Sequence, residues 1–123
     1  MFIEAKDMLR PKIYVINKRK VYNVDYVSFD DKSYGVTEKY GLYEEYTFNE
    51  VALMENTGYK DKNGKYIYLG DIVEIVGTLF EVKYKIFKGY AIENEDYTLS
   101  LEANFDTATV VGNIYENKEL LNG

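Results

Sequence analysis

The stretch Thr57–Val76, which reads Thr-Gly-Tyr-Lys-Asp-Lys-Asn-Gly-Lys-Tyr-Ile-Tyr-Leu-Gly-Asp-Ile-Val-Glu-Ile-Val, decides the fold that the sequence predicts. It contains three bends at close spacing. Gly58 can take the positive φ that ends a strand or a tight turn. Asp61–Gly64 predicts a reverse turn, and its Asn-Gly pair is the strongest short signal for a type I′ bend. Gly70–Asp71 predicts a second turn that leads directly into a strand at 72–76.

These bends indicate backbone geometry rather than chemistry. A calcium-binding loop needs oxygen ligands at alternating positions and a glutamate at the twelfth, and Lys62 and Lys65 interrupt that pattern. A phosphate-binding loop needs Gly-Lys-Ser/Thr between a strand and a helix, and no such sequence follows these glycines. We therefore interpret the group as a structural turn motif, made of Gly58, Asp61, Asn63, Gly64, Gly70 and Asp71.

Two segments of the chain resemble the YopX family of phage and prophage proteins. The first is Leu53–Val73, which contains the turn motif, and the second is Val110–Leu121, which reads Val-Val-Gly-Asn-Ile-Tyr-Glu-Asn-Lys-Glu-Leu-Leu. The resemblance implies a mostly β fold and a small phage-related protein, and it implies no settled activity. The chain departs from the family where Lys12–Asn17 lacks the usual Arg and Trp, and where Lys118 replaces a common Pro.

Composition narrows the class of protein. The chain has 123 residues, the size of one domain or of one barrel with an appended subdomain, and its 46% apolar content is enough for a core. It contains no Cys, so a disulfide framework and thiolate chemistry are excluded. It also contains no His, which removes the commonest general base and zinc ligand. We expect neither a cofactor nor an enzymatic activity.

The net charge of −6 argues against general binding to a phosphate backbone, which needs clustered Lys and Arg. The longest apolar runs are far shorter than the roughly 18 residues of a membrane span. Acidic residues near the N-terminus, in Met1–Asp7, do not fit a signal peptide. We therefore expect no membrane partner and a location in the cytoplasm of a host bacterium.

Short strands and turns dominate the first half of the chain. The pattern predicts a strand at 12–16 and a returning strand at 20–29 with a bulge near Tyr26, where the apolar residues change face. Residues 34–46 read as an irregular strand or a loop. Val51–Met54 predicts a buried strand, with a helical turn near Asn49 as the alternative. Residues 5–9 are compatible with one helical turn or a frayed arm.

The second half shows clearer alternation. Residues 79–87 place Phe80, Val82, Tyr84 and Ile86 on an expected inner face and Glu81, Lys83 and Lys85 on the outer face. Further strands are expected at 90–93, 97–101 and 108–111, and Asn117 is expected to cap a short helix that ends at Leu121. Five short strands joined by tight turns favour an SH3-like barrel.

The sequence thus predicts a mainly β protein. A small SH3-like barrel with a C-terminal helix is expected at 51–123, and a β-hairpin or irregular β subdomain at 1–50. The two parts are alternatively one compact unit.

One candidate contact surface emerges from the alternating strand and its turn. Positive and aromatic side chains interleave there, which is a pattern that can contact nucleic acid, although the polar face of any antiparallel strand produces it too. The surface comprises Lys83, Tyr84, Lys85, Phe87, Lys88 and Tyr90.

Acidic side chains gather in two stretches, 38–55 and 91–107, which would suit a basic protein partner or mimic nucleic acid if they adjoin. The adjacent pairs Glu44–Glu45 and Glu95–Asp96 are poor candidates for hydrolysis, because neighbours on a strand face opposite ways. We therefore expect a phage-type accessory protein that works by contact with a host or phage protein, or with a second copy of itself. The alternatives are a nucleic-acid-binding barrel and an acidic inhibitor of a host nucleic-acid-binding protein.

Overall fold

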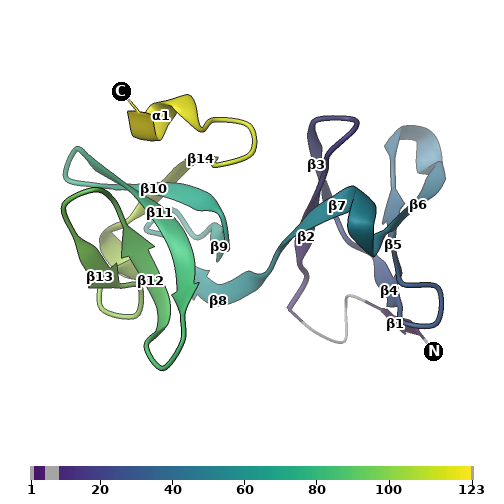
Figure 1. The fold of residues 1–123 in the computed structure, drawn as a ribbon, viewed down its shortest axis with the longest axis horizontal. Coiled ribbons are helices and arrows are strands. Elements are labelled where there is room, and N and C mark those ends of the chain that lie inside the picture. Colours follow the sequence, from purple (N-terminus) through teal and green to yellow (C-terminus); the bar gives the residue numbers. More distant parts are fainter. Residues whose placement is uncertain (1, 5–8, 123) are drawn as a thin grey trace. The chain divides into compact units, whose positions relative to one another are not determined.

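The computed structural model describes residues 2–4, of which only the backbone is considered, and residues 9–122. The helical turn considered for residues 5–9 falls almost wholly outside this part. The chain forms two compact units, unit 1 (Met1–Glu55) and unit 2 (Asn56–Gly123), and strands dominate both. Figure 1 shows the strands of each unit. The expected mainly β class is confirmed.

Unit 1 contains a three-stranded antiparallel sheet in the order β3-β2-β7. Its strands are β2 (Lys12–Val15), β3 (Lys20–Asn23) and β7 (Val51–Met54). The strand predicted at 51–54 is present, but only Met54 is buried and Leu53 is 47% exposed, so the expected burial is wrong. A short 3-10 helix, Phe48–Glu50, directly precedes it, where the alternative placed a helical turn. A capping box holds this helix, because Thr47 N–H donates to Glu50 Oε1 at 2.8 Å.

The second sheet of unit 1 has four strands in the order β1-β4-β5-β6. They are β1 (Phe2–Glu4), β4 (Tyr26–Ser28), β5 (Ser33–Thr37) and β6 (Tyr43–Thr47). The prediction of one bulged strand at 20–29 is wrong, since β3 and β4 belong to different sheets. Between them, the side chain of Val24 is completely buried and its N–H donates to the Pro11 carbonyl at 3.2 Å. The point near Tyr26 where the apolar residues change face is therefore the point where the chain passes from one sheet to the other.

The irregular strand or loop expected at 34–46 is in fact a regular hairpin. β5 and β6 pair antiparallel from Ser33↔Thr47 to Thr37↔Tyr43, and a 3-10 turn, Lys39–Gly41, joins them. The glycine that obscured this pattern, Gly35, lies under the Tyr26 ring. A Cβ there would come within 2.0 Å of Tyr26 Cε1, so the ring occupies the space that a larger side chain would need.

The two sheets of unit 1 share a core to which tyrosines contribute directly. The Tyr22 and Tyr46 rings stack with their centroids 5.8 Å apart. The chain contains 14 tyrosines, and these two contribute to core packing. The buried cluster comprises Ile13, Val15, Tyr22, Val24, Val27, Tyr34, Val36 and Tyr46.

Unit 2 is built on a five-stranded antiparallel sheet in the order β13-β12-β11-β10-β14. Its strands are β10 (Asp71–Ile75), β11 (Thr78–Lys85), β12 (Gly89–Glu93), β13 (Thr98–Ser100) and β14 (Thr109–Asn113). A separate pair consists of β8 (Asn56–Lys60) and β9 (Tyr66–Tyr68). The sheets do not close into a barrel, so the expected barrel closure is corrected to an open sheet.

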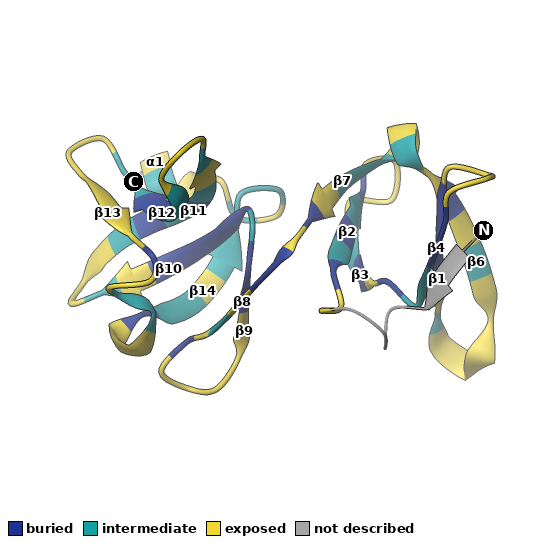
Figure 2. Cartoon of the chain, turned by 90° about the horizontal axis from the view of Figure 1, so that it is seen from below, coloured by how far each residue is buried: buried dark blue, intermediate teal, exposed yellow. Residues whose placement is uncertain are grey.

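The core of unit 2 lies along β10, β11 and β12, and Figure 2 shows the buried stretch of β10. The core cluster comprises Ile67, Val73, Phe80, Val82, Ile92, Leu101 and Ala108. A 3-10 helix, Phe105–Thr107, leads into β14, and α1 (Glu119–Asn122) ends the described chain. The expected helix is present. However, Asn117 Oδ1 accepts from the Asn113 N–H at 3.2 Å, so this side chain bonds back to the end of β14 rather than to the helix.

The predicted inner face of β11 is correct only for its first half. Phe80 and Val82 are buried, whereas Tyr84 is 59% exposed and Ile86, in the following turn, is 73% exposed. The alternation continues along the strand, but the core ends after Val82. Tyr84 and Ile86 therefore lie in solvent beyond the edge of the core.

Candidate functional site

Asp61 is the central residue of the turn motif, and its carboxylate accepts hydrogen bonds from three backbone N–H groups. Its Oδ1 accepts from the N–H groups of Asn63 (2.9 Å) and Lys65 (3.0 Å), and its Oδ2 accepts from Val110 N–H (2.9 Å). Burial alone would raise the pKa of this carboxyl, but the hydrogen bonds from the backbone of Val110, Lys65 and Asn63 together have the larger, opposite effect. The pKa of Asp61 therefore lies below its ordinary value.

Other polar residues of the same segment are also buried and bonded to backbone. Thr57 Oγ1 donates to the Ile67 carbonyl at 2.7 Å, which links β8 to β9. Asp71 Oδ2 accepts from Tyr68 N–H at 2.8 Å across the turn at Gly70. Buried polar side chains need such partners, and backbone supplies them here. The segment is thus a stabilised frame for the sheet.

The turn at Asp61–Gly64 has a different geometry from the one predicted. Gly64 has φ +81°, while Asn63 does not have a positive φ, as a type I′ turn would require at both central residues. The bond from Gly64 N–H to the Asp61 carbonyl (3.0 Å) instead fits a type I turn followed by a left-handed glycine. The two-residue turn with positive φ at both positions is Val76–Gly77, between β10 and β11.

The two sequence segments that carry the family resemblance meet in space within unit 2. Gly70 accepts from Ile114 N–H at 2.8 Å through its carbonyl. A Cβ at Gly70, where φ is +89°, would come within 3.0 Å of the Tyr115 ring. β10 also pairs with β14 from Asp71↔Asn113 onward. Residues 56–73 of the first segment and the closing segment therefore belong to one unit, and the closing segment packs against the turn at Gly70.

Two lysines of the candidate contact surface share one carboxylate partner, Glu93. Lys83 Nζ lies 3.0 Å from Glu93 Oε1, and Lys85 Nζ lies 2.8 Å from Glu93 Oε2. Hydrogen bonds from Lys85, and then from Lys83 and Thr98, lower the pKa of Glu93 to about 2. One carboxylate thus bridges two of the three lysines on which a nucleic-acid contact would depend.

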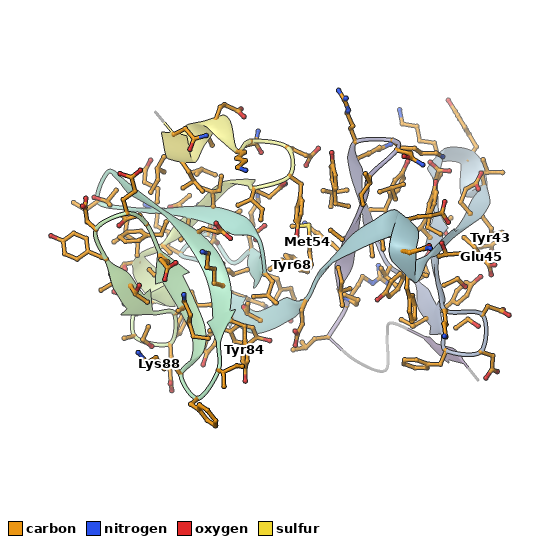
Figure 3. All side chains as sticks on the ribbon, in the orientation of Figure 1. Tyr43, Glu45, Met54, Tyr68, Tyr84 and Lys88 are labelled. Carbon is orange, nitrogen blue, oxygen red and sulfur yellow. The ribbon has the colours of Figure 1, made fainter. Side chains whose placement is uncertain are left out.

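The aromatic side of that surface forms the end of the β11–β12 hairpin. Phe87 is fully exposed at the apex and has φ +68°. Tyr84 and its cross-strand partner Tyr90 make an edge-to-face contact, with ring centroids 5.5 Å apart and planes at 75°. Figure 3 shows Tyr84 and Lys88 on this hairpin. The structure therefore brings the aromatic residues together and separates them by face from Lys83 and Lys85.

The model of the YopX protein family matches residues 12–122. The chain belongs to the YopX family. A solved structure, the crystal structure of protein EF1440 from Enterococcus faecalis, is similar at 25% sequence identity with a TM-score of 0.62, and the match covers 91% of this chain and 96% of that one. No curated protein matches the chain. These findings identify the family of the chain and one solved structure with a similar fold. They assign no activity to this YopX-family protein.

Two further hollows of the YopX-family protein were considered as sites. In unit 2, α1 and the outer face of β11 enclose an open groove of about 660 Å³ that includes Glu81, Lys83 and Leu121. In unit 1, a hollow of about 520 Å³ is lined by side chains of both signs, among them Lys20 and Glu38. The groove of unit 2 is mainly acidic, since Glu81, Glu93, Glu95 and Asp96 line it together with Lys83. The hollow of unit 1 carries both signs, and neither lining selects a ligand class.

Tyr22 lines the hollow of unit 1. Burial, assisted by the neighbouring Glu38 carboxylate, raises the pKa of Tyr22 to about 12. Both effects favour the protonated form of its hydroxyl. Glu44 and Glu45 oppose Val36 and Gly35 in the β5–β6 pairing and so point to opposite faces of the sheet.

Among residues 2–4 and 9–122, no three acidic side chains converge into a group that could hold a metal ion. No helix within the same described ranges is long and apolar enough to cross a membrane.

Proposed function

We propose that this YopX-family protein works by binding another protein, and that the tip of the β11–β12 hairpin is the contact. The tip comprises Tyr84, Ile86, Phe87 and Lys88. The observation that carries the proposal is Phe87, a large apolar side chain that is fully exposed at an apex with positive φ. A positive φ is strained for a residue with a side chain, and such strain concentrates at sites of function.

The size of the apolar patch distinguishes this tip from an ordinary exposed residue. Single exposed apolar residues are common on protein surfaces and need no explanation. Val76, also at a hairpin apex with positive φ, is such a case, because its apolar chain neighbour Ile75 is only partly exposed and Gly77 follows it. Phe87 instead follows Ile86 directly and comes three residues after Tyr84, and both of these side chains are more than half exposed. Burial of the Phe87 side chain in a partner's pocket would contribute about 2 kcal/mol.

Charge favours protein over nucleic acid as the partner. Glu93 bridges Lys83 and Lys85, which leaves Lys88 as the exposed cation of the candidate surface. One cation gives little phosphate neutralisation. The family resemblance supports a phage or prophage origin, with a host or phage protein as the partner.

The test is affinity capture from host lysate with two matched variants. Asn tolerates positive φ, so Phe87→Asn and Val76→Asn should both retain the fold. Phe87→Asn should lose the captured protein, whereas Val76→Asn should retain it, and nuclease treatment should not release it. Equal capture by both variants would reject the hairpin tip. A partner that nuclease removes would support nucleic-acid binding instead.

A further inference from the structure

We propose that the open edge of β6, in unit 1, binds an extended basic segment of another protein by strand addition. β6 is the last strand in the order β1-β4-β5-β6. Within residues 2–4 and 9–122, β5 pairs with one side of β6 and no strand pairs with the other. The observation is independent of the β11–β12 hairpin tip, which lies in the other unit. Either proposal stands if the other fails.

The backbone groups that point outward from β6 follow from the hydrogen bonds at its two ends. Phe48 N–H donates to the Lys32 carbonyl at 2.8 Å, and Glu38 N–H donates to the Leu42 carbonyl at 2.7 Å. In the antiparallel register, these two pairs bracket the strand and fix which residues bond to β5. The backbone groups of Glu44 and Tyr46 face β5, while those of Tyr43 and Glu45 face away.

Thr47 also faces away, but its N–H already donates to Glu50 Oε1 at 2.8 Å. Tyr43 and Glu45 therefore supply the outward donors and acceptors to which an added strand would bond. The edge contains no Pro, Lys or bulge, which are devices that commonly block strand addition. By contrast, next to edge strand β14 in unit 2, Lys62 N–H bonds the Ala108 carbonyl and Asp61 bonds the Val110 N–H.

Charge selects the occupant of this edge. β6 presents Glu45 on the same face of the sheet as Tyr26, whose hydroxyl donates a hydrogen bond to Glu45 Oε1, while Glu44 points to the opposite face. This hydrogen bond to Glu45 and burial, with smaller contributions from the nearby Asp31 and Asp25 carboxylates, raise the pKa of Tyr26 to about 12. This side of the sheet therefore has a negative potential, and a strand with Lys or Arg at alternate positions would complement it.

The same charges disfavour a second copy of this chain. Self-pairing of β6 about its centre would place glutamates beside glutamates, and like charges directly opposite one another destabilise a strand pair. An apolar rim gives a partner additional contact area, since Tyr40 is fully exposed and Tyr43 is 80% exposed. Figure 3 shows Tyr43 and Glu45 on β6, and Figure 2 shows that strand largely exposed.

The probe for this proposal is a short capped peptide of alternating lysine and valine, added to the full chain. Amide hydrogen exchange followed by NMR reads the edge directly. In the free protein, the amides of Tyr43 and Glu45 should exchange quickly and those of Glu44 and Tyr46 slowly. The peptide should protect Tyr43 and Glu45 and leave Glu44 and Tyr46 unchanged.

Two control peptides separate strand addition from simple charge attraction. A peptide with glutamate in place of lysine should give no protection. A lysine-valine peptide with alternate amides N-methylated should also fail, because it lacks the donors of a strand. Protection by the glutamate peptide would overturn the choice of a basic occupant. Equal binding of the methylated peptide, or no protection by any peptide, would overturn strand addition.

Protein variants complete the test. Glu45→Gln keeps an oxygen acceptor for Tyr26 and should weaken the basic peptide by up to about fivefold, the range of one exposed ion pair. Glu119→Gln, an exposed glutamate on α1 in unit 2, removes the same charge and should leave peptide binding unchanged. Protection of Tyr43 and Glu45 that rises with protein concentration, without peptide, would identify a second copy as the occupant and overturn the proposal.

Discussion

At the scale of single residues, left-handed backbone shows where the chain accepts strain. Val76 and Phe87 stand at opposite ends of β11, each at a hairpin apex, with φ of +48° and +68°. The left-handed conformation costs about 1–2 kcal/mol for a residue with a Cβ. Val76 is not flanked by large exposed apolar side chains, so a role in binding does not explain its strained backbone.

We predict that Val76→Asn stabilises the protein by about 1 kcal/mol. Asn-Gly is the preferred sequence for a two-residue turn with positive φ at both positions, and Val76 is 96% exposed, so little packing is lost. The measurement is the urea midpoint, with Val76→Ala as a control that should gain less. A lower midpoint for the Asn variant would show that the valine side chain makes stabilising contacts.

Asp61 gives a second prediction at this scale, because one side chain accepts three backbone hydrogen bonds. Asp61→Asn should destabilise the protein by about 2 kcal/mol, since the amide nitrogen cannot accept from Val110 N–H. Asp106→Asn removes a charge of the same kind from an exposed position and should have little effect. Equal losses for the two variants would assign the effect to net charge.

The stability that Asp61 contributes should depend on pH in a defined direction. Its pKa is lowered in the folded state, so the contribution is present above the unfolded value and is lost as pH falls through the folded value. The gap in stability between the native protein and Asp61→Asn should be full at neutral pH. It should narrow below about pH 4. A gap that stays constant into acid would contradict the carboxylate role.

At the scale of elements, β11 shows how far alternation alone can predict structure. The period of two correctly placed Phe80 and Val82 inward, but it could not show where the core ends. That limit depends on the neighbouring strands, which pair through residues distant in sequence. The sheet change at Val24 and the hairpin over Gly35 escaped prediction for the same reason, since each depends on contacts between strands.

The candidate site was predictable to a similar degree. Sequence brought Tyr84, Phe87, Lys88 and Tyr90 into one hairpin because they are close along the chain. It could not reveal that Glu93, on the adjacent strand, forms ion pairs with both Lys83 and Lys85. The β6 edge was not predicted from the sequence, because Gly35 and Gly41 made that region read as irregular. The pattern that could have indicated it is the acidic pair flanked by tyrosines at 43–46.

A pair of substitutions in β11 tests this division between core and hairpin tip. Val82→Asp should destabilise unit 2 by about 3–5 kcal/mol, because it places an unpaired charge in the core. Tyr84→Asp, two residues on and on the same face, should change stability by less than about 1 kcal/mol. Denaturant unfolding compares the two. Similar losses would show that the core extends to Tyr84.

At the scale of the whole molecule, the net charge of −6 disfavours association with negatively charged partners such as nucleic acid. Surface charge repels a phosphate backbone over roughly 8 Å at physiological salt, so only a local cluster of free cations could engage it. The pairing of Lys83 and Lys85 with Glu93 removes the best such cluster. The distribution of charge therefore agrees with protein contact as the proposed mode of action.

We predict that the native protein does not bind random duplex DNA appreciably at physiological salt. Glu93→Gln releases Lys83 and Lys85 and should bind measurably at low salt, with a slope of log affinity against log salt near about −2, as two neutralised phosphates require. Glu102→Gln changes net charge equally at an exposed site in the same unit and should not bind. Fluorescently labelled duplex, titrated at two salt concentrations, gives the measurement. Micromolar binding by the native protein that weakens steeply with salt would reject protein contact as its main activity, because the lysines would then engage phosphate despite Glu93.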